Sequence, residues 1–95
     1  MPESKEYSWT WVTASQLLTD LECELVYALL VPSGAETGTI IYNGVDTNGE
    51  VVTYLVSAVA TQQPFSPPVP IYCRKGLYIT KGSATTGVLV VWRRL

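Results

Sequence analysis

Hydrophobic and polar residues alternate with a period of two along most of the chain, and this pattern predicts β-strands. Residues 5–13 place Tyr7, Trp9 and Trp11 on one side of a strand and smaller residues on the other. Residues 21–31 form the strongest predicted strand, with apolar residues at every odd position, which we expect to face the core. Its even positions begin with two glutamates and then become apolar, so we expect one end to be covered on both faces.

Further short strands are predicted between turns rich in Gly, Asn and Pro, over residues 39–42, 51–57, 71–73, 77–80 and 87–93. Residues 14–20 fit either a loop or one short helical turn. Residues 64–70 contain four prolines, each of which lacks a backbone N–H. We therefore expect this segment to be an extended loop that crosses between two sheets.

Seven or eight short strands without a helical repeat predict an all-β chain. We expect a small antiparallel β-sandwich or jelly roll, with a small open barrel as the alternative. The chain has 95 residues, enough for one modest core, so residues 1–95 are predicted to form one domain. Residues 1–6 are mostly polar, and we expect a flexible N-terminal arm there.

The composition is apolar for so small a domain, with 47% hydrophobic and 15% charged residues. This excludes a disordered chain and predicts that another chain covers part of the apolar surface. The longest apolar run, residues 25–31, is too short for a transmembrane helix. The first residues lack the apolar run of a signal peptide, so we expect synthesis in a cytoplasm and no membrane partner.

Candidate catalytic chemistry is sparse, because the sequence contains no histidine. Glu22 and Glu24 are a carboxylate pair of the kind that glycosidases use, but a solvated strand end also explains them. Asp46, Asn48 and Glu50 alternate like oxygen ligands of Ca²⁺, but they do not follow the EF-hand pattern and also suit a hairpin turn. We expect no enzyme activity, no cofactor and no metal site.

Cys23 and Cys73 are too few for a disulfide scaffold or a four-thiolate zinc site. We expect two reduced, buried thiols that behave as small apolar side chains. A single bridge between these two cysteines is the alternative.

Charge is divided unequally between the two halves of the chain. The first 50 residues hold one Lys against eight acids and carry −7, whereas the last 45 carry +5. Basic residues close to aromatic ones are one route to nucleic-acid binding, but no such motif is present and the net charge is −2. We expect no nucleic-acid partner, and we expect the two halves to neutralise each other between subunits.

The aromatic stripe of Tyr7, Trp9 and Trp11 suits either a sugar-binding platform or a buried contact. We favour core or subunit interface, where Trp and Tyr are enriched. The last predicted strand is apolar on both faces, so part of it is expected to join the same interface. The predicted interface residues are aromatic, apolar or basic: Tyr7, Trp9, Trp11, Val88, Val90, Trp92, Arg74, Lys75, Arg93 and Arg94.

A pattern of strand ends and turns in this sequence is similar to that of a known group of proteins. It comprises residues 70–80 (PIYCRKGLYIT), 82–83 (GS) and 87–93 (GVLVVWR), with residues 29–34 (LLVPSG) and 41–43 (IYN) in the first half. This pattern resembles that of small virion structural proteins of tailed phages.

The resemblance implies a compact β-sandwich that decorates or cements a capsid, or forms a head fibre, and has no catalytic residues. It also implies a homotrimer in the virion, with the major capsid protein as its partner. The alternative function is a carbohydrate- or receptor-binding module of a head fibre or tail appendage, which would use Tyr7, Trp9 and Trp11.

Overall fold

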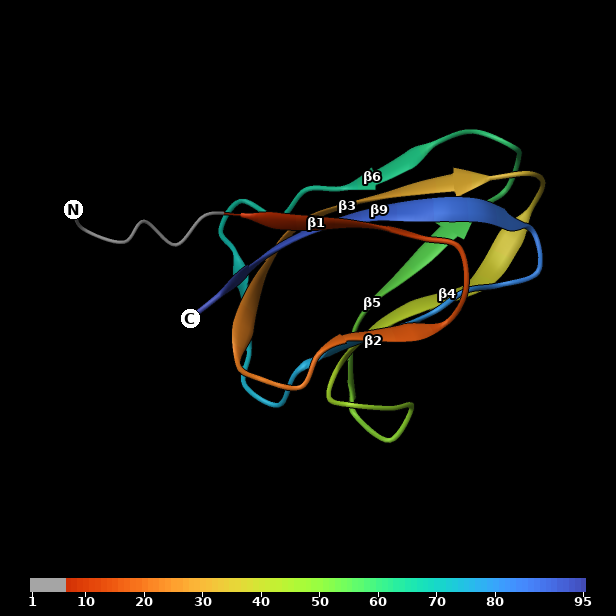
Figure 1. The fold of residues 1–95 in the computed structure, drawn as a ribbon. Coiled ribbons are helices and arrows are strands. Elements are labelled where there is room, and N and C mark those ends of the chain that lie inside the picture. Colours follow the sequence, from red (N-terminus) through yellow and green to blue (C-terminus); the bar gives the residue numbers. More distant parts are fainter. Residues whose placement is uncertain (1–6) are drawn as a thin grey trace.

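A computed structural model describes residues 7–95, and within them it contains nine β-strands and no helix. The all-β prediction is confirmed, and two antiparallel sheets lie over each other as the layers of a small sandwich (Figure 1). The predicted arm, residues 1–6, lies outside the described residues. The strands are β1 (Ser8–Val12), β2 (Gln16–Thr19), β3 (Cys23–Pro32), β4 (Glu36–Asn43), β5 (Glu50–Ser57), β6 (Gln63–Phe65), β7 (Ile71–Cys73), β8 (Leu77–Thr80) and β9 (Thr85–Arg94).

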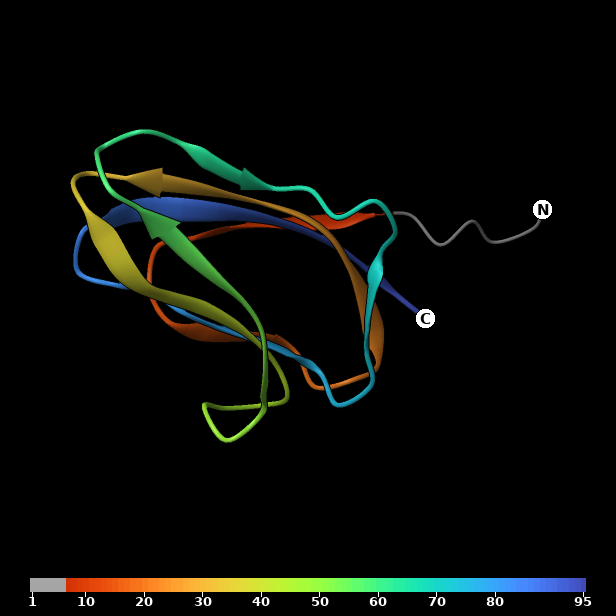
Figure 2. The same cartoon turned by 180° about the vertical axis from the view of Figure 1, so that it is seen from behind.

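Each sheet mixes strands from distant parts of the chain. The first, sheet A, has the order β1-β9-β3-β6, and β7 also pairs with β3. The second, sheet B, has the order β2-β8-β4-β5. The two layers separate clearly in the view from behind (Figure 2). The two longest strands, β3 and β9, pair along most of their lengths and form the centre of sheet A.

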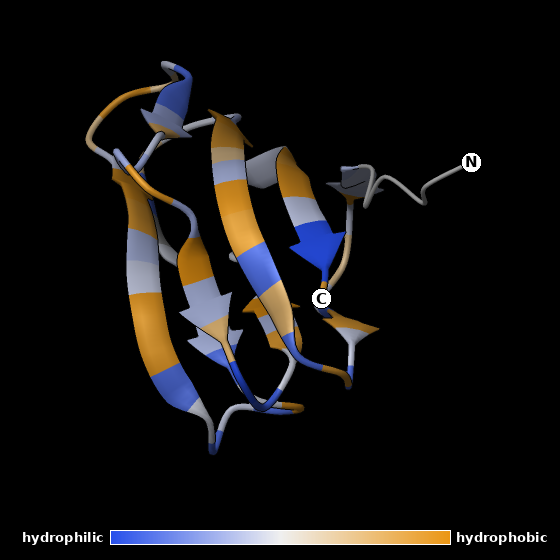
Figure 3. Ribbon diagram, turned by 90° about the vertical axis from the view of Figure 1, so that its left-hand side faces the viewer, coloured by the Kyte–Doolittle hydropathy of each residue, from blue (hydrophilic) through white to orange (hydrophobic). Residues whose placement is uncertain are grey.

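The core lies between the two sheets. Apolar residues recur along the strands of both layers (Figure 3). Sheet A contributes fully buried Leu25, Val88 and Val90, which belong to one cluster with Ile41 and Ile79 of sheet B. Removal of these side chains from water is the main favourable contribution to folding.

Residues 14–20 form neither of the expected structures, because they contain the short strand β2. This strand pairs with β8 at the edge of sheet B. Leu18 packs against the core, whereas Leu17 is exposed. Pairing with a neighbouring strand has overridden a local sequence signal that was weak on its own.

The alternation along β3 inverts part-way, which corrects the prediction that its odd positions all face the core. The register with β9 shifts between Leu25 and Tyr27, as in a β-bulge. Before the shift Leu25 is buried, whereas after it Ala28 and Leu30 are buried and Tyr27 is only half-buried. One extra residue in a strand moves every later side chain to the opposite face.

The proline-rich segment does not cross between the sheets as expected. Both β6, which contains Pro64, and β7 pair with β3, so this segment follows sheet A. A proline is tolerated in such an edge strand because no neighbour needs its N–H. The chain returns to sheet B through residues 74–76, where Gly76 has a φ of 125°. A Cβ at Gly76 would lie 2.7 Å from the carbonyl oxygen of Thr19, so this corner requires glycine.

Candidate functional site

Sheet A has a second apolar surface on the side that faces away from the core. Its side chains form rows across neighbouring strands, because residues opposite each other in a sheet point to the same side. Val91 of β9 lies between Trp9 of β1 and Tyr27 of β3, and Leu89 lies between Trp11 and Leu29. The outer face of sheet A consists of seven exposed or half-buried residues: Trp9, Trp11, Tyr27, Leu29, Val31, Leu89 and Val91.

The two tryptophans are the most prominent part of this outer face. Trp9 is 71% exposed and Trp11 is 43% exposed. The indole of Trp11 lies over Gly87, where an added Cβ would come within 2.3 Å of the ring atom Cζ2. Gly87 lies diagonally across from Trp11, whose register partner is Leu89, and glycine at this position makes room for the ring against the sheet.

A polar cluster borders the outer face at one end. The guanidinium of Arg93 lies 5.5 Å from the centre of the Tyr7 ring and also donates a hydrogen bond to the carboxylate of Glu24. Next to this pair, the hydroxyl of Tyr72 donates to Glu22, and this hydrogen bond raises the pKa of Tyr72 above its ordinary value. Glu24 of the acidic first half and Arg93 of the basic second half thus form an ion pair within one chain.

Four of the predicted interface residues lie on the outer face or at its border: Tyr7, Trp9, Trp11 and Arg93. Val88, Val90 and Trp92 instead point into the core and are buried, which corrects their assignment to an interface. Because β9 is apolar on both sides, its sequence alone does not distinguish the side that meets sheet B from the side that faces outward.

The other predicted basic residues lie away from the outer face. Arg74 and Lys75 are exposed in the segment that leads from β7 to β8, where the backbone N–H of Lys75 donates to Asn43. Arg94 is exposed at the end of β9. The outer face also includes residues that were not predicted as interface residues, and the two-sided apolar pattern of β3 and β9 was the available signal for them: Tyr27, Leu29, Val31, Leu89 and Val91.

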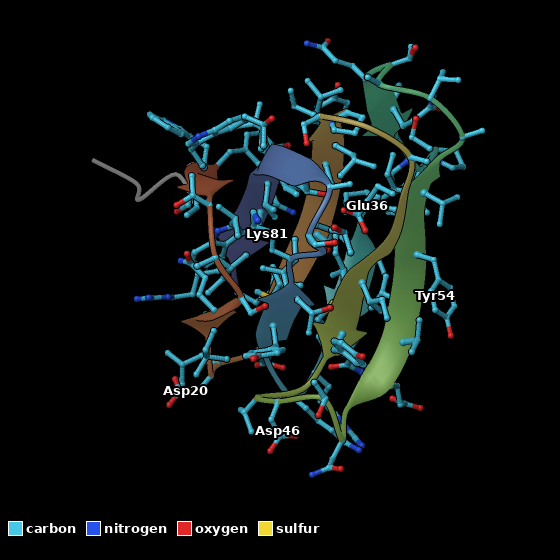
Figure 4. All side chains as sticks on the ribbon, turned by 90° about the vertical axis from the view of Figure 1, so that its right-hand side faces the viewer. Asp20, Glu36, Asp46, Tyr54 and Lys81 are labelled. Atoms are coloured by element: carbon cyan, nitrogen blue, oxygen red, sulfur yellow. The ribbon has the colours of Figure 1, made fainter. Side chains whose placement is uncertain are left out.

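The buried carboxylate of Glu36 joins the two sheets where β4 and β9 begin. Glu36 at the start of β4 accepts hydrogen bonds from the backbone N–H groups of Gly38 and Ala84 and from the hydroxyl of Thr85. It lies between the layers in Figure 4, whereas Tyr54 of β5 points outward. A buried carboxylate is stable only when such donors surround it. Glu36 therefore links sheet B to the start of β9, a contact that the sequence did not predict.

The remaining acids considered as catalytic or metal-binding residues have local partners. Asp46 accepts a hydrogen bond of 2.8 Å from the backbone N–H of Asn48, which is an Asx turn. Glu50 accepts one of 3.1 Å from the side chain of Asn43. In the part of the chain that the structure describes, no group of three or more His, Cys, Asp or Glu residues is placed to hold a metal ion.

Comparisons with protein-family models, curated proteins and solved structures found no match to this chain. Among residues 7–95, the structure contains no helix with the length and apolar character needed to cross a membrane. The outer face of sheet A is therefore the candidate functional site on the basis of its geometry alone.

Proposed function

We propose that this protein is a non-enzymatic structural protein that binds other protein subunits through the outer face of sheet A. More specifically, we propose a capsid decoration or cement protein of a tailed-phage virion. The observation that carries the proposal is the continuous apolar outer face, with Trp9 at its most exposed point.

The composition of the outer face suits a protein interface. Its centre holds two tryptophans, a tyrosine and aliphatic residues, with no charged side chain among them. The charged residues Arg93 and Glu24 lie at its border. Interfaces between proteins have this arrangement, in which aromatic residues are enriched at the centre and polar groups form the rim.

Self-association is the proposed use of this outer face, with a homotrimer as the expected assembly. A specific interface of this kind typically buries roughly 800 Å² on each partner. Arg74, Lys75 and Arg94 lie elsewhere on the surface and remain exposed for a second contact. We propose that this second contact is to the major capsid protein, so that one oligomer bridges several coat subunits and gains affinity from multivalency.

The assignment to a virion is supported by the sequence pattern of residues 70–80 and 87–93, which resembles that of small tailed-phage structural proteins. These residues form β7, β8 and most of β9, including the corner at Gly76. The pattern therefore coincides with strands and turns of the sandwich.

Light scattering behind a sizing column, at several protein concentrations, tests the self-association. We expect an oligomer for the unmodified protein and a shift to monomer for Trp9→Thr. Tyr54→Thr is the matched control, because Tyr54 is 60% exposed on sheet B, which is the other layer. A monomer at all concentrations, or equal effects of the two substitutions, would contradict the proposed interface.

Cosedimentation with undecorated phage capsids tests the second contact. We expect the protein to pellet with capsids and to raise the temperature at which they disrupt. Arg74→Glu combined with Lys75→Glu should weaken this binding without changing the mass of the free oligomer. Failure to bind capsids by a protein that still forms oligomers would remove the virion part of the proposal and leave the self-association in place.

A carbohydrate-binding module is the second candidate function. It is favoured by the high exposure of Trp9 and by the neighbouring ring of Tyr7, because flat aromatic surfaces stack on sugar rings. Tryptophan fluorescence titrated with a panel of glycans distinguishes the two functions. A saturable shift with one glycan, abolished by Trp9→Thr, would favour the module, whereas no shift with any of them would count against it.

A further inference from the structure

The two cysteines of this chain occupy directly opposite positions on paired strands. Cys23 at the start of β3 is the register partner of Cys73 at the end of β7. Both thiols are free and fully buried. We propose that Cys23 and Cys73 are a thiol–disulfide pair, which forms a reversible bridge between β3 and β7 when the protein meets an oxidising disulfide. This inference is independent of the proposed function.

The backbone is already spaced for such a bridge. Residues opposite each other in antiparallel strands have Cα atoms about 4.5–5.5 Å apart. Disulfides join cysteines whose Cα atoms are about 4.4–6.8 Å apart. Because opposite residues also point to the same side of the sheet, both thiols face the interior, and no rearrangement of the two strands is needed to join them.

The two thiols are chemically unequal. A hydrogen bond from Cys23 and another from the backbone N–H of Leu25 lower the pKa of the Cys73 thiol. The same contact with Cys73, together with burial, raises the pKa of the Cys23 thiol. The thiolate is the nucleophile in disulfide exchange. Cys73 lies on the short edge strand β7, which opens more easily than β3, so Cys73 is the residue that reacts first.

Oxidised glutathione is a suitable oxidant. The Cys73 thiolate attacks one of its sulfur atoms, the glutathione S–S bond breaks, and one glutathione thiolate leaves. Cys23 then loses its proton and attacks Sγ of Cys73, which forms the Cys23–Cys73 bond and releases the second glutathione thiolate. The two protein thiols lose two electrons and two protons, and the glutathione disulfide becomes two glutathione thiols. An excess of reduced thiol reverses both steps.

Access to the buried sulfurs requires only local opening. The pairing of β7 with β3 spans three register pairs, and β7 lies between the proline-rich segment and the corner at Gly76. Short edge segments of this kind open more easily than the central strands of a sheet. A bridge would fasten this segment to β3 and restrict the unfolded chain between residues 23 and 73.

The test uses the whole chain, first fully reduced and then incubated with oxidised glutathione. We expect a mass loss of two hydrogen atoms and, after digestion without reductant, a peptide pair linked through Cys23 and Cys73. The oxidised form should unfold at a temperature higher by roughly 10 °C or more, since disulfides that close long loops commonly stabilise small domains to this extent. Dithiothreitol should reverse both changes.

A parallel sample treated with iodoacetamide at the same temperature reports whether the thiols become accessible. Complete alkylation there without a bridge in the oxidised sample would overturn the proposal, as would glutathione adducts or intermolecular dimers as the end products. Cys73→Ser should show no rise in unfolding temperature with oxidant. If this variant does not fold, the comparison between the oxidised and alkylated wild-type samples decides the proposal without it.

Discussion

The inner and outer faces of sheet A are made by alternate residues of the same strands and are similarly apolar. On the inner face, Leu25, Val88 and Val90 are fully buried because sheet B lies over them. On the outer face, Leu89 and Val91, which alternate with Val88 and Val90 along β9, remain half-buried. The tryptophans of β1 are exposed. Residues 7–95 therefore complete the burial of only one of the two faces. An apolar residue in a strand indicates a covered face but not whether the same chain provides the cover.

The largest difference in stability between the two faces should appear when one leucine on each face is replaced by alanine. Leu25→Ala removes a fully buried side chain and should cost about 2–5 kcal/mol of unfolding free energy. Leu29→Ala, on the half-buried outer face, should cost less than about half as much. Urea unfolding at a concentration that keeps the protein monomeric measures both. Equal losses would show that the outer face is as fully packed as the core.

Substitution of Glu36, the buried carboxylate that joins the two sheets, should have the next largest effect on stability. Glu36→Gln keeps the shape of the side chain but replaces a buried charged acceptor of several hydrogen bonds, so we expect a loss of about 1–3 kcal/mol. The control is Glu50→Gln, because Glu50 is exposed and its carboxylate accepts a hydrogen bond from Asn43; this substitution should change stability by less than about 0.5 kcal/mol. A neutral Glu36→Gln would mean that apolar packing alone holds the two sheets together.

The packing of Trp11 on the outer face is tested by Gly87→Ala. The new methyl group would overlap the indole, so we expect a loss of about 1–3 kcal/mol and a change in tryptophan fluorescence. In a Trp11→Ala background the same substitution should cost little, because the clash is absent. A double-mutant cycle of thermal unfolding measures this coupling. Additive effects of the two substitutions would show that the ring does not lie on Gly87 in solution.

The ion pair at the border of the outer face should matter least for stability. Arg93 and Glu24 keep 32% and 23% of their side chains exposed, so Glu24→Gln should cost only about 0.2–1 kcal/mol. This cost should shrink further in high salt, since exposed charges are screened. A larger loss that salt does not change would place the pair in the packed interior rather than at the border.

A titration of tyrosine absorbance examines the same border. The hydrogen bond to Glu22 raises the pKa of Tyr72, and Glu22→Gln should return it toward the ordinary value of a tyrosine. Because the folded pKa is the higher one, this contact stabilises the fold below about pH 10 and its contribution is lost as the pH rises through the folded pKa. An unchanged absorbance titration in the variant would contradict the hydrogen bond.

Much of the fold could be predicted from local pattern. The strands over residues 51–57, 71–73 and 77–80 lie within one residue of β5, β7 and β8. Local pattern did not predict β2, which has only four residues, or β6, an edge strand that contains Pro64. The candidate site was predicted in part: Tyr7, Trp9 and Trp11 were identified, but the residues beside them on β3 and β9 were not.

The sequence by itself determined that the chain is all-β and that some of its strands are apolar on both sides, because alternation with a period of two depends only on neighbouring residues. Only the tertiary structure decided which side of β9 faces sheet B. It also placed Cys23 opposite Cys73 and surrounded Glu36 with donors from residues 84 and 85. These outcomes depend on which distant strands pair and in what register, and a shift of one residue, such as the bulge in β3, exchanges the two faces.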